Sequence, residues 1–225
     1  MRIYIIRHAD PDYDNDTLTS VGHREAFALA ERLEAERINR IYCSPLGRAR
    51  RTMQYTAERL NQEAEIQEWL QELSGMSIHH GEWGRLAAWD VPGEALYQQQ
   101  VQMAYAELNF DEQLNSIIWY SDQFLQKLGY VRRDGRYQCV HPHTNRIAVF
   151  CHNGFGLTWL AHLLHLPLLS VWTSFWLPPS SVTTILFEQR SPEWAVPRCL
   201  GLGDTGHLHK AGLVVQPRGI MANFD

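Results

Sequence analysis

The chain begins with a short apolar run, residues 1–6, that stops abruptly at Arg7 and His8. Its β-branched and aromatic residues predict a buried strand. A polar, turn-rich segment follows, and in open α/β sheets ligands bind beyond the carboxyl ends of the strands. Arginine offers a fork of donors suited to phosphate, and a neutral histidine offers a nucleophilic nitrogen. The pair therefore suggests a phosphohistidine site on His8, with a simple surface Arg-His pair at a strand end as the alternative.

Strand and helix patterns alternate along both ends of the chain. Strands are predicted at 40–43, 146–151, 182–187 and near 195–200, the run 146–151 being apolar enough for burial on both faces. Helices are predicted from a cap at Thr19 or Ser20, over about 47–61, and over about 155–166. This alternation predicts an α/β fold with parallel pairing and right-handed crossovers.

The middle of the chain, about residues 74–145, interrupts that alternation. Residues 93–129 have a mostly helical pattern, and residues 130–140 resemble a hairpin around Asp134-Gly135. We expect an insertion that covers or borders the site. The prediction is one domain over residues 1–225, a three-layer α/β/α sandwich with a mostly parallel, roughly six-stranded sheet.

Net charge, cysteine usage and the pattern of apolar segments limit the binding partners and the cell compartment that we expect for this protein. The formal net charge of -5 gives no reason to expect nucleic acid or an anionic membrane as partner, so a phosphate site must be a local cluster of positive charge. The four cysteines form no C-x-x-C pair, and Cys43 and Cys151 lie in strand-like runs, which indicates buried free thiols. No signal peptide and no spanning segment is apparent, so we expect a cytoplasmic protein.

Three predicted strands end in chemically suitable side chains. The first ends at Arg7-His8, the second leads through Ser44-Pro45-Leu46 to Arg48, and the buried strand ends at His152. Because parallel strands end at the same edge of a sheet, these residues should converge.

This set of motifs resembles the histidine phosphatase superfamily, the phosphoglycerate mutase-like proteins. The resemblance spans residues 1–73 and 146–208, and the middle is unmatched by motif. The matching segments are the Arg7-His8 pair, Leu18-Thr19-Ser20-Val21-Gly22, Ser44-Pro45-Leu46-Gly47-Arg48-Ala49-Arg50-Arg51-Thr52, His152 after its strand, and Asp204-Thr205-Gly206-His207-Leu208.

The resemblance implies a phosphomonoesterase in which His8 attacks the phosphoryl group. Arg7, Arg48 and His152 would surround the phosphoryl oxygens, and no metal or other cofactor is expected. The proton donor of the family follows a Leu-x-Glu pattern, which Leu70-Gln71-Glu72 matches, and Glu82 in a delayed Gly-x-Trp segment is the rival.

Two asparagines are further candidates for phosphate binding. Asn15 lies about one residue from the position of the asparagine that binds phosphate in mutase-type members, and it is otherwise a turn residue. Asn153 would orient the phosphate or cap the helix that follows.

The alternatives are a mutase-type phosphotransferase and a non-catalytic phospholigand-binding protein. The residues after His8, Ala9-Asp10-Pro11, lack the Gly-Glu-Ser stretch of mutases. The expected partner is a small phosphorylated metabolite or another phosphomonoester, and a phosphate or sulfate ion would fit the same site. The sequence names no substrate and leaves a homodimer open.

Overall fold

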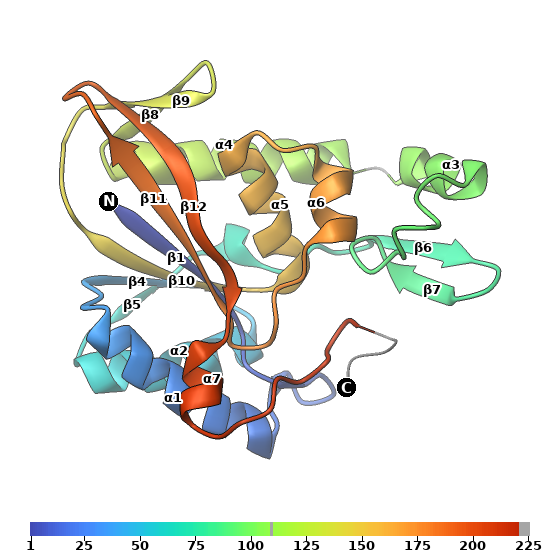
Figure 1. The fold of residues 1–225 in the computed structure, drawn as a ribbon, viewed down its shortest axis with the longest axis horizontal. Helices are drawn as coiled ribbons and strands as arrows, with labels where there is room; N and C mark the ends of the chain where they lie inside the picture. The colour runs from blue at the N-terminus through green and yellow to red at the C-terminus, as the bar shows by residue number, and fades with distance from the viewer. Residues whose placement is uncertain (109, 221–225) are drawn as a thin grey trace.

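An eight-stranded sheet lies between two layers of helices in the computed structural model, which describes residues 1–108 and 110–220 (Figure 1). This is the predicted three-layer α/β arrangement. In spatial order the strands are β5 (Ala64–Ile66), β4 (Arg40–Cys43), β10 (Arg146–Cys151), β1 (Arg2–Arg7), β11 (Val182–Gln189), β12 (Trp194–Asp204), β9 (Arg136–Cys139) and β8 (Tyr130–Arg133).

The sheet is mostly parallel, as predicted, but it is larger than the expected six strands. Strands β5, β4, β10 and β1 pair in parallel, and β11, β12, β9 and β8 add antiparallel pairs. Strands β5, β4, β10, β1, β12 and β8 therefore run one way, and only β11 and β9 run the other. Two additions explain the difference in number: the short strand β5 extends one edge, and the hairpin β8–β9 joins the other edge.

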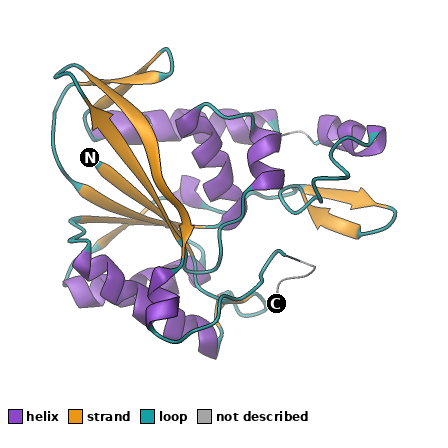
Figure 2. Cartoon of the chain, viewed as in Figure 1, coloured by secondary structure: helices purple, strands orange, loops and turns teal. Residues whose placement is uncertain are grey.

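Each face of the sheet has its own apolar core because side chains alternate along a strand. Ile3 and Ile5 of β1 face the layer that contains α4 (Asp111–Lys127) and α5 (Asn153–Leu164). Tyr4 and Ile6 belong to the opposite core, with apolar residues of α1 (Ser20–Ala35) and α2 (Gly47–Leu60). Figure 2 shows the resulting layers of helix, sheet and helix.

The helices near the site begin close to where the sequence predicts. Helix α1 starts at Ser20, and the Thr19 side chain accepts a hydrogen bond from the Gly22 amide, which confirms the predicted cap. Helix α5 starts directly after His152 at the end of β10. The sequence pattern gave no indication of α6 (Leu168–Ser174), the 3-10 turn η1 (Glu68–Leu70) or α7 (Gly206–Lys210).

The middle of the chain divides into two parts. Strands β6 (Ser77–His80) and β7 (Gly84–Ala87) form a small sheet that projects with α3 (Gln99–Glu107) beyond the main body (Figure 1). Helix α4 and the hairpin β8–β9 instead pack with the main sheet. A further two-stranded sheet, β2 (Pro11–Asp12) with β3 (Thr17–Leu18), closes the turn after His8.

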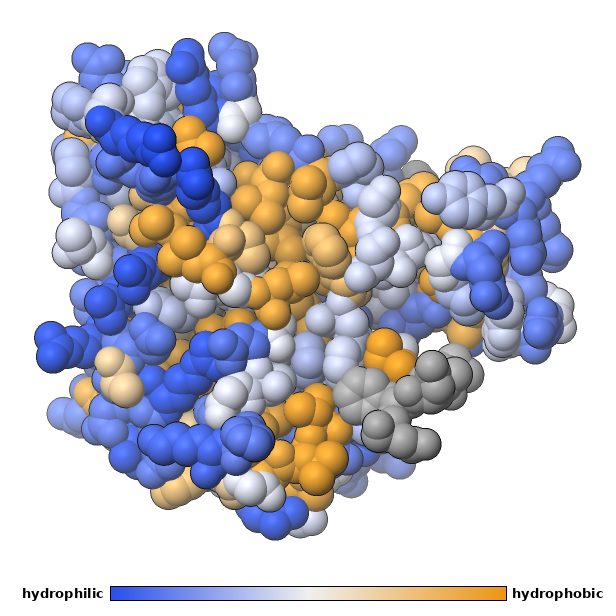
Figure 3. All heavy atoms as spheres, in the orientation of Figure 1, coloured by the Kyte–Doolittle hydropathy of each residue, from blue (hydrophilic) through white to orange (hydrophobic). Residues whose placement is uncertain are grey.

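One face of the molecule carries a concentration of apolar side chains. Figure 3 shows them over the centre of the view, beside β12, whose exposed residues include Val196 and Leu200. Cys43 and Cys151 are buried free thiols, as predicted. Within residues 1–108 and 110–220, no helix is both long enough and apolar enough to cross a membrane.

Candidate active site

His8 lies at the carboxyl end of β1 and is only 2% exposed. Its backbone amide donates to the Cys151 carbonyl on β10, and its carbonyl accepts from the Ser180 amide. The ring atom Nδ1 lies 2.8 Å from the Ala9 carbonyl oxygen. A carbonyl can only accept, so Nδ1 carries a proton and Nε2 of the neutral ring has a free lone pair.

The surroundings of His8 keep its imidazole neutral. Burial moves the pKa of His8 well below 6.5, and the nearby positive charges of Arg7 and Arg48 lower that pKa further. The hydrogen bond to Ala9 raises the pKa of His8, but its effect is smaller than those of burial and of Arg7. The ring is therefore uncharged at neutral pH, the state in which an imidazole nitrogen can act as a nucleophile.

His152 lies beside His8 with its ring centroid 5.2 Å away, so the predicted convergence of strand ends is present. Its Nε2 atom is 2.8 Å from the hydroxyl of Ser44 at the end of β4. Its Nδ1 atom is buried and has no hydrogen-bond partner within the described part of the chain. Burial, and then the neighbouring His8, hold the pKa of His152 well below 6.5.

Arg7 precedes His8 and is 3% exposed. Its Nη1 atom donates to two backbone carbonyls, of Leu177 at 2.6 Å and of Arg218 at 3.2 Å. Its Nε atom is buried without a partner among the described residues. Carbonyl acceptors orient the guanidinium without neutralising it, so its charge stays available for an anion.

Arg48 occupies the first turn of α2, and its Nη1 atom contacts Asp16 at 2.8 Å. Asp16 also accepts a hydrogen bond from the Gly47 amide at 2.6 Å, so one carboxylate fixes both the helix start and the guanidinium. Tyr13 lies next to both site residues: its ring is 5.6 Å from the Arg48 Cζ atom and 6.4 Å from the His8 ring centroid. The sequence analysis missed Asp16 and Tyr13, because nothing in the pattern distinguishes them from other loop residues.

Glu72 follows the 3-10 turn η1, far from α5 in the sequence. Its carboxylate lies at the N-terminus of α5, the helix that begins directly after His152. Its Oε1 atom accepts from the amides of Phe155 at 2.8 Å and Leu73 at 3.0 Å. Its Oε2 atom accepts from the Gly154 amide alone, at 3.1 Å. Burial raises the pKa of Glu72 above 4.5, although these backbone donors and Arg7 act to lower it.

The remaining predicted residues lie in different surroundings. Glu82 is exposed in the turn between β6 and β7. The Asn15 amide donates to Asp12 at 2.8 Å in an exposed local turn. The Asn153 side-chain oxygen accepts from the Leu177 amide, so Asn153 supports the loop that holds Arg7. Asn153 is itself the first residue of α5, and the N-cap position belongs to His152.

Asp90 is a further acidic residue at this site and was not predicted. It is partly buried, and burial raises its pKa to about 6. The positive charge of Arg7 lowers that pKa, and the negative charge of Glu72 raises it. Its position after β7, outside the matched motifs, explains why sequence reasoning overlooked it.

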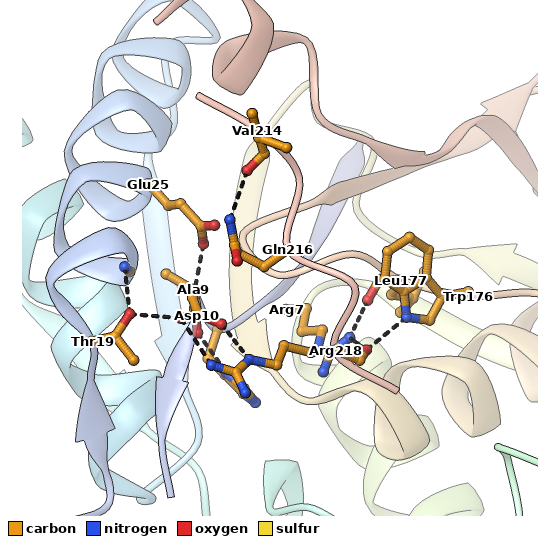
Figure 4. A network of polar contacts seen from close by, with 12 residues as sticks. Arg7, Ala9, Asp10, Thr19, Glu25, Trp176, Leu177, Val214, Gln216 and Arg218 are labelled. Atoms are coloured by element: carbon orange, nitrogen blue, oxygen red, sulfur yellow. Dashed lines mark hydrogen bonds and ion pairs between the residues drawn. The ribbon is translucent and has the colours of Figure 1, made fainter. Parts of the chain in front are cut away.

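The C-terminal segment runs across the site (Figure 4). The Arg218 guanidinium donates to the buried Asp10 carboxylate at 2.6 Å, and Thr19 donates to the same carboxylate. The Arg218 carbonyl accepts from both Arg7 and the Trp176 indole. The segment therefore helps to orient Arg7, although its weak sequence pattern did not suggest a role.

Glu25 on α1 holds the loop after His8 by a hydrogen bond to the backbone of that loop. It is 0% exposed, and its Oε2 atom accepts from the Asp10 amide at 2.8 Å. Its Oε1 atom is buried with no hydrogen-bond partner among the described residues. Burial raises the pKa of Glu25 from 4.5 to about 7.

We expect Glu25→Gln to change how stability depends on pH. Since the pKa of Glu25 in the folded state lies above its unfolded value, the wild type should lose stability as the pH rises from 4.5 through about 7. The variant should lack this loss, so its free energy of unfolding above pH 8 should exceed that of the wild type by about 3 kcal/mol. Urea denaturation at low and high pH measures the difference. An equal effect at both pH values, or the same pH effect from the exposed Glu31→Gln, would contradict this account.

His207, from the late motif, contacts the segment that holds the His8 backbone. It is 5% exposed, and its Nε2 atom is 3.1 Å from the Ser180 hydroxyl. Because the Ser180 amide donates to the His8 carbonyl, His207 supports the backbone of His8 through Ser180.

Comparisons with known proteins identify the family of the chain. The sequence model of the histidine phosphatase superfamily (branch 1) matches residues 3–198. No curated protein sequence matches the chain.

Similar solved structures include two phosphatases. A phosphoserine phosphatase from Entamoeba histolytica, in complex with phosphoserine, superposes with a TM-score of 0.63 at 20% identity, covering 92% of this chain and 98% of the other. A mycobacterial glucosyl-3-phosphoglycerate phosphatase superposes with a TM-score of 0.61 at 20% identity, covering 90% and 98%. At this level of identity the likeness establishes the shared fold.

Proposed function

Since the chain belongs to branch 1 of the histidine phosphatase superfamily, we propose that it hydrolyses phosphomonoesters through a phosphohistidine on His8. The observation that carries the proposal is the hydrogen bond from His8 Nδ1 to the Ala9 carbonyl. It fixes the tautomer in which Nε2 is the nucleophile, in a ring that burial and two arginines keep neutral.

In the first step, His8 Nε2 forms a bond to phosphorus and the bond to the ester oxygen breaks. Arg7, Arg48 and His152 stabilise the charge on the phosphoryl oxygens during this transfer. The Nε atoms of Arg7 and Arg48 are buried and have no hydrogen-bond partner among the described residues. This supports the proposed role, because a phosphoryl group would supply acceptors for both.

Glu72 donates a proton to the departing alkoxide. Its Oε2 atom has one backbone donor where Oε1 has two, which leaves Oε2 the better position for the transferable proton. In the second step Glu72, now ionised, accepts a proton from water, and that water attacks phosphorus to release phosphate and restore His8.

The substrate is proposed to be a small phosphorylated metabolite or a related phosphomonoester. Measuring phosphate release from a panel of phosphomonoesters tests the proposal. At least one ester should be hydrolysed with a kcat/KM above about 10⁴ M⁻¹s⁻¹. Absence of phosphate release across the panel would contradict it.

We expect Glu72→Gln to slow esters with poor leaving groups most. Alkyl phosphates need a proton on the departing oxygen, so their kcat/KM should fall by about 10²-fold or more. The kcat/KM for p-nitrophenyl phosphate should fall less than about tenfold, because nitrophenolate leaves without a proton. The kcat/KM values for both classes of ester report the formation of the phosphoenzyme. The later hydrolysis of the phosphoenzyme therefore does not affect the comparison.

Glu82→Gln is the matched control, because Glu82 was the rival proton donor and is exposed in the β6–β7 turn. It should leave both values near those of the wild type. Equal losses for the two ester classes in Glu72→Gln, or the selective loss in Glu82→Gln, would show that Glu72 is not the proton donor.

A further inference from the structure

A cavity of about 500 Å³ opens beside the proposed phosphoryl site. Its walls come from residues between 83 and 93, from the end of α6 with the loop that follows it, and from the C-terminal segment. The lining residues that matter here are Trp83, Trp89, Asp90, Phe175, Trp176 and Gly219. This volume is in the range of small-molecule sites.

Two walls of the cavity contact residues that hold the proposed proton donor and Arg7. The Trp89 ring packs so closely on Gly154 that an added Cβ there would lie 2.5 Å from the ring, and the Gly154 amide is the donor to Glu72 Oε2. Opposite, the indole of Trp176 shares the Arg218 carbonyl with Arg7. The cavity therefore adjoins the proposed proton donor and the phosphoryl-binding arginine together.

The charge of the cavity is unusual for a site that binds phosphate esters. Among the described lining residues, Asp90 alone has a titratable side chain. Its carboxylate accepts no hydrogen bond from the described residues, and Gly219 fits closely against it: an added Cβ there would lie 3.2 Å from Oδ1. No lysine or arginine lines the described wall to receive an acidic leaving group.

Aromatic rings and an unpaired carboxylate together attract organic cations. The faces of tryptophan rings carry negative potential. The Asp90 carboxylate feels the positive charge of Arg7 but accepts no hydrogen bond from a described residue, so its oxygens can take a cationic partner in the cavity. A leaving group with its own carboxylate would instead meet repulsion from Asp90.

We propose that this cavity binds the leaving group and selects phosphomonoesters that carry a protonated amine or a quaternary ammonium. The inference rests on the proposed phosphatase function and adds the class of substrate. Asp90 provides the counter-charge, and the tryptophans surround the cationic group.

Phosphocholine and 3,3-dimethylbutyl phosphate test this directly, because they share shape and differ in one positive charge. We expect the kcat/KM for phosphocholine to exceed that for the neutral isostere by about tenfold at about pH 8. In Asp90→Asn this ratio should fall to about two or less. A ratio within one enzyme cancels any change in overall activity. The exposed Glu94→Gln, four residues away, is the matched control and should keep the wild-type ratio.

The outcomes separate the two proposals. Equal rates for the two esters, an unchanged ratio in Asp90→Asn, or hydrolysis of other phosphomonoesters but neither of these would overturn the cation selectivity and leave the phosphatase function intact. Failure to release phosphate from any phosphomonoester would overturn the phosphatase function itself.

Discussion

His8→Ala should reduce kcat/KM by about 10⁴-fold or more for every phosphomonoester that the wild type hydrolyses. The substitution removes the only imidazole nitrogen that the account assigns to attack on phosphorus. No other described side chain at the site is placed to substitute for it, because His152 Nε2 already contacts Ser44. Steady-state kinetics at saturating and subsaturating substrate measure the loss.

The control for this variant is His209→Ala, which removes an exposed histidine of α7. It should leave kcat/KM within about twofold of the wild type, as surface substitutions away from a site usually do. Retention of more than about a tenth of the activity in His8→Ala would contradict a nucleophilic His8.

Arg7→Gln should reduce kcat/KM by about 10³-fold, equivalent to about 4 kcal/mol of transition-state stabilisation. Glutamine can still donate to the Leu177 or Arg218 carbonyl, but it has no positive charge for the phosphoryl oxygens. The inhibition constant for inorganic phosphate should rise in parallel, since the same charge binds the product.

Arg50→Gln is the matched control, because Arg50 lies on the exposed face of α2, two residues after Arg48. It should change neither constant. Thermal unfolding of Arg7→Gln separates loss of function from loss of fold. A folded Arg7→Gln variant within about threefold of the wild type would show that Arg7 does not stabilise the transition state.

The sequence predicted the centre of the site well because strand geometry determines it. Strands β1, β4 and β10 are parallel neighbours, so Arg7-His8, Ser44 and His152 must meet at one edge. Their short apolar runs are also unambiguous in the sequence. The helices that follow begin within a few residues of their predicted starts for the same local reasons.

The surroundings of His8 could not be predicted, because tertiary contacts determine them. Asp16 reaches Arg48 through a turn with a positive φ of 45°, and Asp90 enters from a segment without periodicity. The Arg218 segment is held by hydrogen bonds to Asp10, Arg7 and Trp176 rather than by a regular element. Residue patterns do not encode such contacts, so these parts required the structure.

At the edge of the sheet, too, the local structure was predictable from the sequence and the long-range pairing was not. The hairpin around Asp134-Gly135 was predicted from its turn residues, but its pairing with β12 was not. That pairing depends on packing against residues far apart in the chain, such as Tyr137 with Phe187. The sheet consequently has eight strands where the sequence indicated about six.

Trapping the phosphorylated enzyme during turnover tests the central claim most directly. Wild-type protein mixed with substrate, quenched within milliseconds in alkaline denaturant and digested, should carry one phosphoryl group on the peptide that contains His8. Phosphorus NMR should place it on Nε2, because the Ala9 carbonyl occupies Nδ1–H. The His8→Ala protein should carry none. A hydrolysing wild type with no phosphoryl group on His8, or with the group on another residue, would contradict the account.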